Sequence, residues 1–151
     1  MEKQEIKAII EGWNTGVEFL DTRQHLEVIV PGENLHTIAE KLKNSPELQF
    51  DFLLDVTAVD WTDRFTMVYH ITSSSLHHVI VVKSTITDRE NPEIDTLSDL
   101  WPTAEFQERE VFDLFGIRFR NHKDLRRLFL DDSWGFPLRK DYTDQNIKEL
   151  K

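Results

Sequence analysis

The sequence predicts an α+β fold: a mostly antiparallel sheet with helices packed on one face, followed by an extended C-terminal tail. Stretches with helix and strand periodicity follow one another in the order α-β-β-α-β-β-β-α. The links between successive strand candidates are short and polar, which favours antiparallel neighbours. Hydrophobic residues make up 39% of the 151 residues and aromatic residues 11%, which is enough to build a core.

The first third of the chain predicts a helix, a hairpin and a second helix. Residues 2–11 carry three isoleucines on one side of a short amphipathic helix. Val17–Leu20 and His25–Val30 are apolar strand candidates, and the four polar residues between them suit a hairpin turn. Helical spacing of apolar residues resumes over Glu33–Lys43, and the Asn-Ser-Pro sequence after it stops the helix.

Three strand candidates follow, at Phe50–Val59, Phe65–Thr72 and His77–Ser84. The acidic turn between the first two, at residues 60–63, is interpreted as a hairpin turn with solvated carboxylates. A loop is expected around Asp88–Asp95, and Thr96–Leu100 suits a single helical turn.

A third helix is predicted from Ala104 to Phe115, with Thr103 as its cap and Gly116 as its left-handed stop. Glu108 falls within the apolar stripe of this helix. A buried carboxylate must gain a cationic partner or be protonated. We therefore expect Glu108 to pair with one of three arginines further along the chain, Arg126, Arg127 or Arg139.

After a short strand at Ile117–Phe119, the chain mixes turn-forming residues with large apolar ones, and it cannot bury these within its own secondary structure. It must lie along its own domain or along another chain. We therefore divide the protein into an α+β domain at residues 1–115 and an extended signature segment and tail at residues 116–151, which docks on neighbouring subunits.

Composition excludes several classes of protein. There is no cysteine, so disulfides, thiolate metal sites and cysteine-ligated clusters are excluded, and the five glycines form no phosphate-binding loop. No apolar run reaches the roughly 20 residues of a membrane span, and the N-terminus lacks the features of a secretion signal, so a soluble cytoplasmic protein is expected. The net charge is −10, which argues against nucleic-acid binding.

Charge is spread unevenly. Residues 1–105 hold 8 Lys/Arg against 19 Asp/Glu, whereas residues 106–151 hold 10 against 9. The basic cluster in the second part is either a solvated face or a docking surface for an acidic partner. No catalytic or metal site is expected: His77 and His78 point to opposite faces of a strand, and Glu108 and Glu110 face different directions on a helix.

The C-terminal third resembles the signature of the C subunit of bacterial NADH:quinone oxidoreductase (respiratory complex I), the family of the mitochondrial iron–sulfur protein subunit 3. The residues that carry the resemblance lie in the family's order and spacing over about 35 positions: Glu108, Arg109, Glu110, Asp113, Phe115, Gly116, His122, Arg126, Arg127, Pro137, Arg139, Lys140, Asp141 and Tyr142. The chain departs from the family pattern at Phe106, where a tryptophan is usual, and at Lys123, where a proline is usual.

The resemblance implies a cofactor-free peripheral-arm subunit of a proton-translocating enzyme that transfers electrons from NADH to quinone. It implies two kinds of partner on the cytoplasmic side of the cell membrane: the D subunit, which helps form the quinone site, and the cluster-bearing subunits. No catalytic, cofactor-binding or metal residue and no activity of the isolated chain are expected. The best candidates for partner contacts are Arg126, Arg127, Arg139 and Lys140.

Two alternatives remain open. One is the homologous subunit of a membrane-bound energy-converting hydrogenase or a related dehydrogenase, because that complex would share the same signature. The other is a free-standing α+β binding protein with a ligand pocket.

Overall fold

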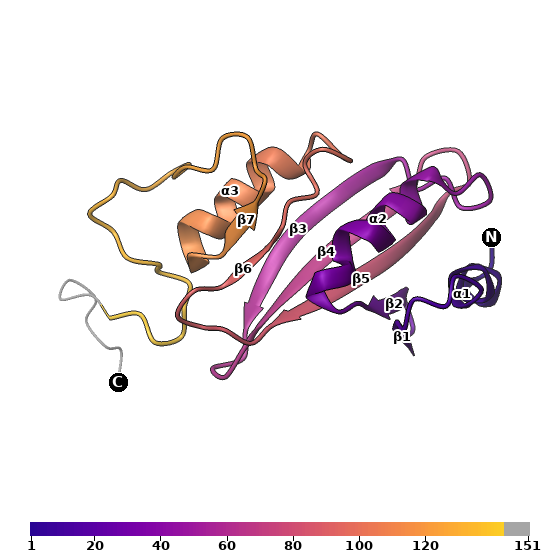
Figure 1. Cartoon of the computed structure of the whole chain (residues 1–151), viewed down its shortest axis with the longest axis horizontal. Coiled ribbons are helices and arrows are strands. Elements are labelled where there is room, and N and C mark those ends of the chain that lie inside the picture. Colours follow the sequence, from indigo (N-terminus) through magenta and orange to yellow (C-terminus); the bar gives the residue numbers. More distant parts are fainter. Residues whose placement is uncertain (144–151) are drawn as a thin grey trace.

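The structure, a computed structural model, describes residues 1–143. Its main sheet has five strands in the order β1-β2-β5-β4-β3. The strands of this sheet are β1 (Glu18–Asp21), β2 (Leu26–Ile29), β3 (Phe52–Asp60), β4 (Phe65–Ser73) and β5 (His78–Ile86). The other elements are α1 (Lys3–Glu11), a 3-10 turn (Gly32–Asn34), α2 (Leu35–Asn44), β6 (Glu93–Asp95), α3 (Ala104–Phe115) and β7 (Arg118–Arg120) (Figure 1).

The α+β fold and its mostly antiparallel sheet are confirmed. The hairpins β1–β2, β3–β4 and β4–β5 are antiparallel, as the short polar links predict, and the ends of these elements differ from prediction by one or two residues. The pairing of β2 with β5 is parallel. This parallel pair arises because the chain crosses the sheet through α2 after β2 and returns to the centre only at β5.

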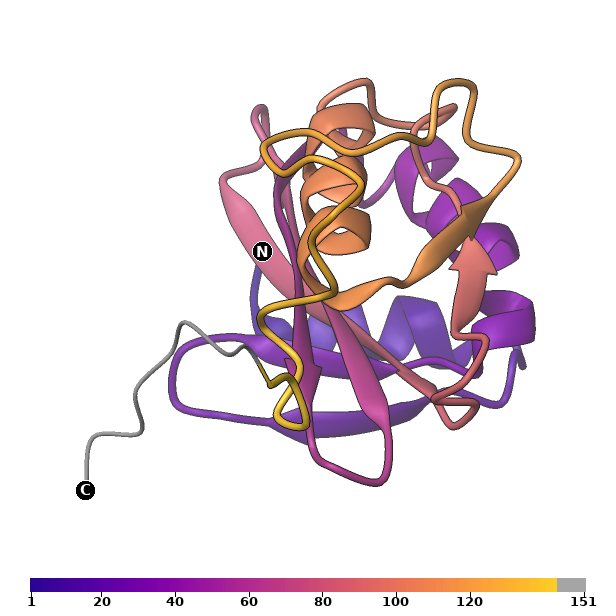
Figure 2. The same cartoon turned by 90° about the vertical axis from the view of Figure 1, so that its left-hand side faces the viewer.

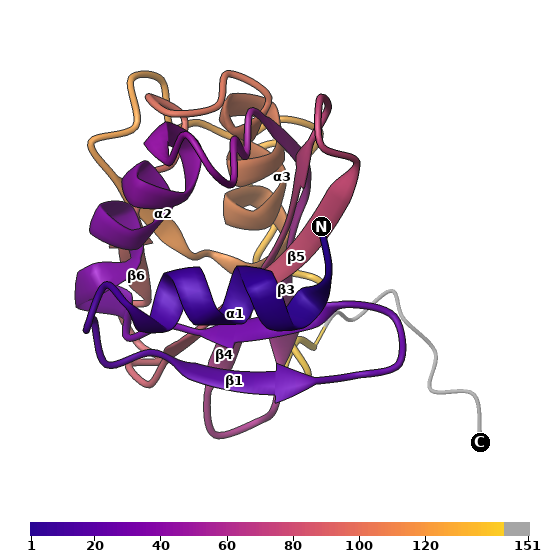
Figure 3. The ribbon, with the colours of Figure 1, turned by 90° about the vertical axis from the view of Figure 1, so that its right-hand side faces the viewer.

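The helices lie on one face of the sheet, as predicted. Along β4, Phe65, Met67, Tyr69 and Ile71 are fully buried and belong to one hydrophobic core with residues of all three helices. The residues between them on β4 point to the other face, which no element in residues 1–143 covers to the same extent. Figure 3 shows α1, α2 and α3 gathered on the same side of the sheet.

Two predictions about the second half are wrong. The expected loop at residues 88–95 contains β6, which pairs in parallel with β7 to form a second sheet of two strands. Thr103 stands at the N-cap of α3, but its hydroxyl donates to the carbonyl of Leu53 (3.0 Å) and does not cap the helix. Thr103 therefore attaches α3 to the edge strand β3 of the sheet.

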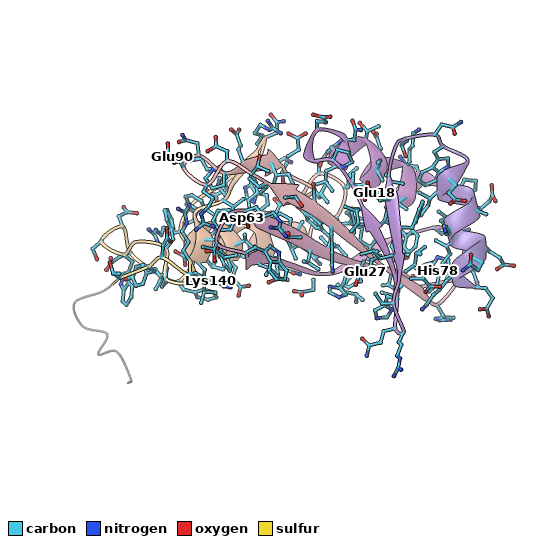
Figure 4. All side chains as sticks on the ribbon, turned by 90° about the horizontal axis from the view of Figure 1, so that it is seen from below. Glu18, Glu27, Asp63, His78, Glu90 and Lys140 are labelled. Atoms are coloured by element: carbon cyan, nitrogen blue, oxygen red, sulfur yellow. The ribbon has the colours of Figure 1, made fainter. Side chains whose placement is uncertain are left out.

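The chain after β7 returns over its own domain. Figure 2 shows it passing over α3 and descending to the β3–β4 hairpin. The amide of Leu138 donates to the carbonyl of Leu114 (3.0 Å), and the amide of Lys140 donates to Asp60 (2.8 Å). Figure 4 shows Lys140 and Asp63 of that hairpin at the same end of the molecule. None of the helices within residues 1–143 is long and apolar enough to cross a membrane.

Trp101 joins the approach to α3 to the core. Its side chain is 1% exposed, and its indole N–H donates to the carbonyl of Phe50 (3.1 Å). Trp101→Phe should lower the free energy of unfolding by about 2 kcal/mol, because it leaves a cavity and an unpaired buried carbonyl. The matched change Trp61→Phe, at a side chain that is 51% exposed, should cost about 0.5 kcal/mol. Urea denaturation measures both, and equal losses would contradict this role for Trp101.

Candidate functional site

The signature residues gather where the chain after β7 crosses α3, and a buried carboxylate on α3 organises the crossing. Asp113 is fully buried. Its Oδ2 accepts the amides of Phe129 (2.9 Å) and Leu130 (3.1 Å), and its Oδ1 accepts Arg127 Nη1 (3.2 Å). Burial alone would raise the pKa of Asp113, but these donors hold the pKa below its usual value. Asp113 therefore stays ionised and fixes the returning chain on α3.

Besides its pairing with Asp113, Arg127 binds a later loop of the returning chain. Its guanidinium donates to the carbonyls of Trp134 (2.5 Å) and Gly135 (3.0 Å) and lies 5.0 Å from the ring centre of Phe136. One side chain thus joins the buried carboxylate of α3 to a turn eight residues further on. Such a planar group with several donors is suited to this task.

Arg139 closes the C-terminal end of α3. Its Nε donates to the carbonyl of Phe115 (2.6 Å), where a cation also compensates the negative end of the helix dipole. The guanidinium packs on the rings of Phe136 (5.1 Å) and Phe65 (5.2 Å). Burial lowers the pKa of Arg139, and the neighbouring cation Arg89 lowers it further, against the opposing effect of Asp141.

Asp60 anchors the tail at the β3–β4 hairpin. The expected solvated turn is wrong at this residue, which is only 4% exposed. Its carboxylate accepts both guanidinium nitrogens of Arg89 (2.5 and 3.2 Å) and the amides of Lys140 and Thr62 (2.8 Å each). The Arg89 hydrogen bond is the main reason that the pKa of Asp60 lies well below its usual value. Arg89 also faces Asp141 at 3.6 Å.

Sequence reasoning missed Asp60 and Arg89, although a signal for Asp60 was present. The inward positions of β3 alternate as Val56, Ala58 and Asp60, so strand periodicity places Asp60 on the buried face. Arg89 gave no comparable signal because it lies in a loop.

The expected pairing of Glu108 with an arginine is wrong. Glu108 is fully buried, but its oxygens accept the hydroxyl of Thr96 (2.5 Å) and the amide of Leu97 (2.7 Å). His122 Nε2 lies 3.8 Å from the carboxylate. That nitrogen donates to the carbonyl of Glu105 (3.1 Å) while Nδ1 accepts the amide of Asp124 (3.0 Å), so this hydrogen bonding suits a neutral ring. The three arginines have other partners: Arg126 pairs with Asp124, Arg127 with Asp113 and two carbonyls, and Arg139 with the carbonyl of Phe115.

Glu108 therefore shows the other effect of burial, which is a raised pKa. Burial raises its pKa to about 7, with a smaller contribution from Asp99, although the Leu97 amide and the Thr96 hydroxyl oppose the shift. Tyr69 lies in the same buried region: its hydroxyl has no hydrogen-bond partner in the described structure, and burial, followed by the charge of Glu108, raises its pKa.

The remaining signature residues divide between internal and exposed positions. Arg109 is 5% exposed and donates to the carbonyls of Arg126 (3.3 Å) and Arg127 (3.1 Å), so it holds the returning chain by its backbone. The side chain of Arg126 is 67% exposed and pairs with its neighbour Asp124. The positions that face solvent at least in part are Glu110, Pro137, Lys140, Asp141 and Tyr142. Within residues 1–143, no three His, Asp or Glu side chains converge as metal ligands would.

Gly116 ends α3 in the left-handed conformation, as predicted, with φ 76°. A Cβ on this residue would lie 2.6 Å from the ring of Phe136. Gly116→Ala should lower the free energy of unfolding by about 3 kcal/mol, from backbone strain and displacement of that ring. Gly16→Ala is the control: its φ is 70°, nothing lies within 4 Å of the added carbon, and the strain alone should cost about 1 kcal/mol. Equal losses in chemical denaturation would show that Phe136 does not require a glycine.

The raised pKa of Glu108 makes stability depend on pH. The carboxyl group should stabilise the fold at low pH and lose this contribution as pH rises toward and through 7. The reason is that, between the two pKa values, the unfolded state has released the proton while the folded state still binds it. Between pH 5 and 8 the wild-type protein should lose about 2 to 3 kcal/mol relative to Glu108→Gln, whose amide stands in for the protonated acid. Denaturation curves of both proteins across this range measure the difference, and parallel pH profiles would contradict a raised pKa.

Comparison with known proteins gives consistent matches. Residues 28–147 match the family described as "Respiratory-chain NADH dehydrogenase, 30 Kd subunit". The C subunit of the NADH-quinone oxidoreductase of Moorella thermoacetica is 43% identical over 129 residues, which cover 82% of this chain and 85% of that protein. The C/D subunit of the same enzyme of Phocaeicola vulgatus is 45% identical over 124 residues, which cover 81% of this chain. The chain spans about a quarter of the length of such C/D relatives, 23% in this case.

Two solved structures are similar over most of the chain. A chain of the membrane-bound sulfane sulfur reductase, an archaeal respiratory membrane complex, has a TM-score of 0.81 and 29% identity and covers 93% of this chain and 85% of its own. A trypsin-resistant fragment of Nqo5 has a TM-score of 0.67 and 30% identity and covers 82% of this chain and 100% of its own. The resemblance to the C subunit is confirmed, and the chain belongs to the family of the 30 kDa subunit of respiratory-chain NADH dehydrogenase.

Proposed function

We propose that this chain is a cofactor-free peripheral-arm subunit of a proton-translocating NADH:quinone oxidoreductase, on the cytoplasmic side of the membrane. It supports the D subunit at the quinone site and the cluster-bearing subunits while electrons pass from NADH to quinone. The observation that carries the proposal is the family match over residues 28–147, which includes the α3 crossing built around Asp113. The buried titratable side chains of this crossing serve internal contacts, which suits a structural role.

The experiment is an affinity purification of the tagged chain from membranes. The D subunit and the cluster-bearing subunits should accompany it, and the purified complex should oxidise NADH with a quinone as acceptor. The isolated chain should oxidise nothing. Recovery of the chain from membranes as a monomer of about 18 kDa without partners would contradict the proposal and favour a free-standing binding protein.

The second candidate is the corresponding subunit of another membrane-bound respiratory complex. The high TM-score with a chain of the sulfane sulfur reductase favours it. The same purification separates the two candidates, because only the first predicts subunits that bind NADH and NADH oxidation by the complex.

The exposed Arg126 offers a test of the partner surface that leaves the fold intact, since its ion-pair partner, Asp124, is its own neighbour. Arg126→Ala should reduce recovery of partner subunits about fivefold, corresponding to roughly 1 kcal/mol of binding free energy. Lys41→Ala is the control, at an exposed cation on α2. Quantitative mass spectrometry of the purified samples measures recovery. Equal recovery for both variants, with unchanged melting of the isolated chains, would remove Arg126 from the partner surface.

A further inference from the structure

A cavity of about 550 Å³ opens between the end of α3, the loop before β6 and the returning chain. Its lining combines basic and aromatic side chains, including Arg118, Arg126, Arg127, Arg139, Phe112 and Phe136. Two carboxylates, Glu90 and Asp132, also line it. The cavity therefore carries an excess of positive charge on a chain whose net charge is −10.

Within residues 1–143, carboxylates pair with two of the four arginines. Arg127 pairs with Asp113, and Arg126 pairs with Asp124. Among the described residues no carboxylate lies within 4.0 Å of the guanidinium groups of Arg118 or Arg139. Two cations thus line the cavity without a direct ion pair to any residue between 1 and 143.

Aromatic rings hold both of these cations in place. Arg118 lies 5.6 Å from the ring centre of Phe112, and Arg139 lies 5.1 Å from that of Phe136. The two rings are themselves neighbours, with centres 6.5 Å apart. Stacking uses the face of a guanidinium and leaves N–H groups at its edge for an acceptor. In Arg139, Nε and Nη1 already donate to the carbonyls of Phe115 and Arg89, and Nη2 keeps its donors for a ligand. The unpaired donors are therefore preorganised, which reduces the entropy lost on binding.

The electrostatic environment of Arg139 also favours the binding of an anion. Its partial burial lowers its pKa, so the charged form is less stable there than in water. An anion brought into the cavity would recover this energy through a charge-assisted hydrogen bond.

We propose that this cavity binds a carboxylate side chain from an acidic segment of a partner polypeptide, with Arg118 and Arg139 as the receiving cations. The inference rests on the proposed function, because it identifies the chemistry by which a neighbouring polypeptide of the complex docks. A singly charged carboxylate suits the site better than a doubly charged phosphate, since Glu90 and Asp132 at the lining repel additional negative charge.

Carbodiimide coupling in the complex tests this contact directly, because the reagent joins an amine to a carboxylate only when the two lie close together. Arg118→Lys keeps the charge and introduces an amine at position 118. In the complex purified through the tagged variant, the peptide containing position 118 should be cross-linked to an Asp or Glu of another subunit. Lys123, which does not line the cavity, is the internal control amine and should not give that cross-link.

Each outcome bears on a particular claim. Suppose that partner subunits are present but position 118 is cross-linked only to Glu90 or Asp132, or is not cross-linked at all. That result overturns the inference and leaves the proposed function standing. Absence of all partner subunits from the wild-type sample overturns both.

Charge reversal supplies a second readout. Arg118→Glu should reduce recovery of partner subunits at least tenfold, whereas Lys123→Glu, with the same change in net charge, should reduce it less than twofold. Melting curves of the isolated variants should match the wild type. If both reversals behave alike, the cavity is not the docking point. If the wild-type chain sediments with phosphatidylglycerol vesicles and Arg118→Glu does not, the ligand is a lipid surface and the proposal is wrong.

Discussion

The C-terminal part of this protein depends on one buried carboxylate, that of Asp113. Without its negative charge, Arg127 would be partly buried without a counter-ion, and the amides of Phe129 and Leu130 would lose their acceptor. Such groups are costly when unpaired. The crossing over α3 therefore forms as a unit, with Asp113 as the group that several donors share. The ordinary stabilisation of a helix by burial of apolar residues then holds this carboxylate in position.

A second shared carboxylate links the crossing to the sheet. Asp60 at the end of β3 binds Arg89 from the loop before β6 and the backbone of Lys140 from the tail. The hairpin, the loop and the tail thus meet at one group. Because Arg89 also packs on Phe65, a core residue of β4, the position of the tail is coupled to the packing of the sheet. The proposed supporting role requires such coupling, because a support must hold a fixed geometry.

Periodicity predicted the main sheet and the helices because apolar spacing decides which face of each element is buried. It could not predict β6, since a strand of three residues has no detectable period and depends on β7, which lies far along the chain. The predicted partner of Glu108 was wrong for another reason. Charge pointed to arginines, yet the structure supplies a threonine hydroxyl and an amide from residues 96 and 97. Every residue except proline carries an amide N–H, so the sequence gives no indication of which one will serve.

The arginines of the crossing mostly donate to main-chain oxygens. Arg109 binds carbonyls of the returning chain, Arg127 binds those of Trp134 and Gly135, and Arg139 binds that of Phe115. A carbonyl is present whatever side chain stands at its position. A change of residue at an acceptor position therefore keeps the contact, whereas a change at a donor position removes it. Arg127 has both roles, because its carbonyl accepts Arg109 and its guanidinium donates to Trp134 and Gly135. Each of these hydrogen bonds therefore fixes the residue type at its donor and leaves the side chain at its acceptor unconstrained by that bond.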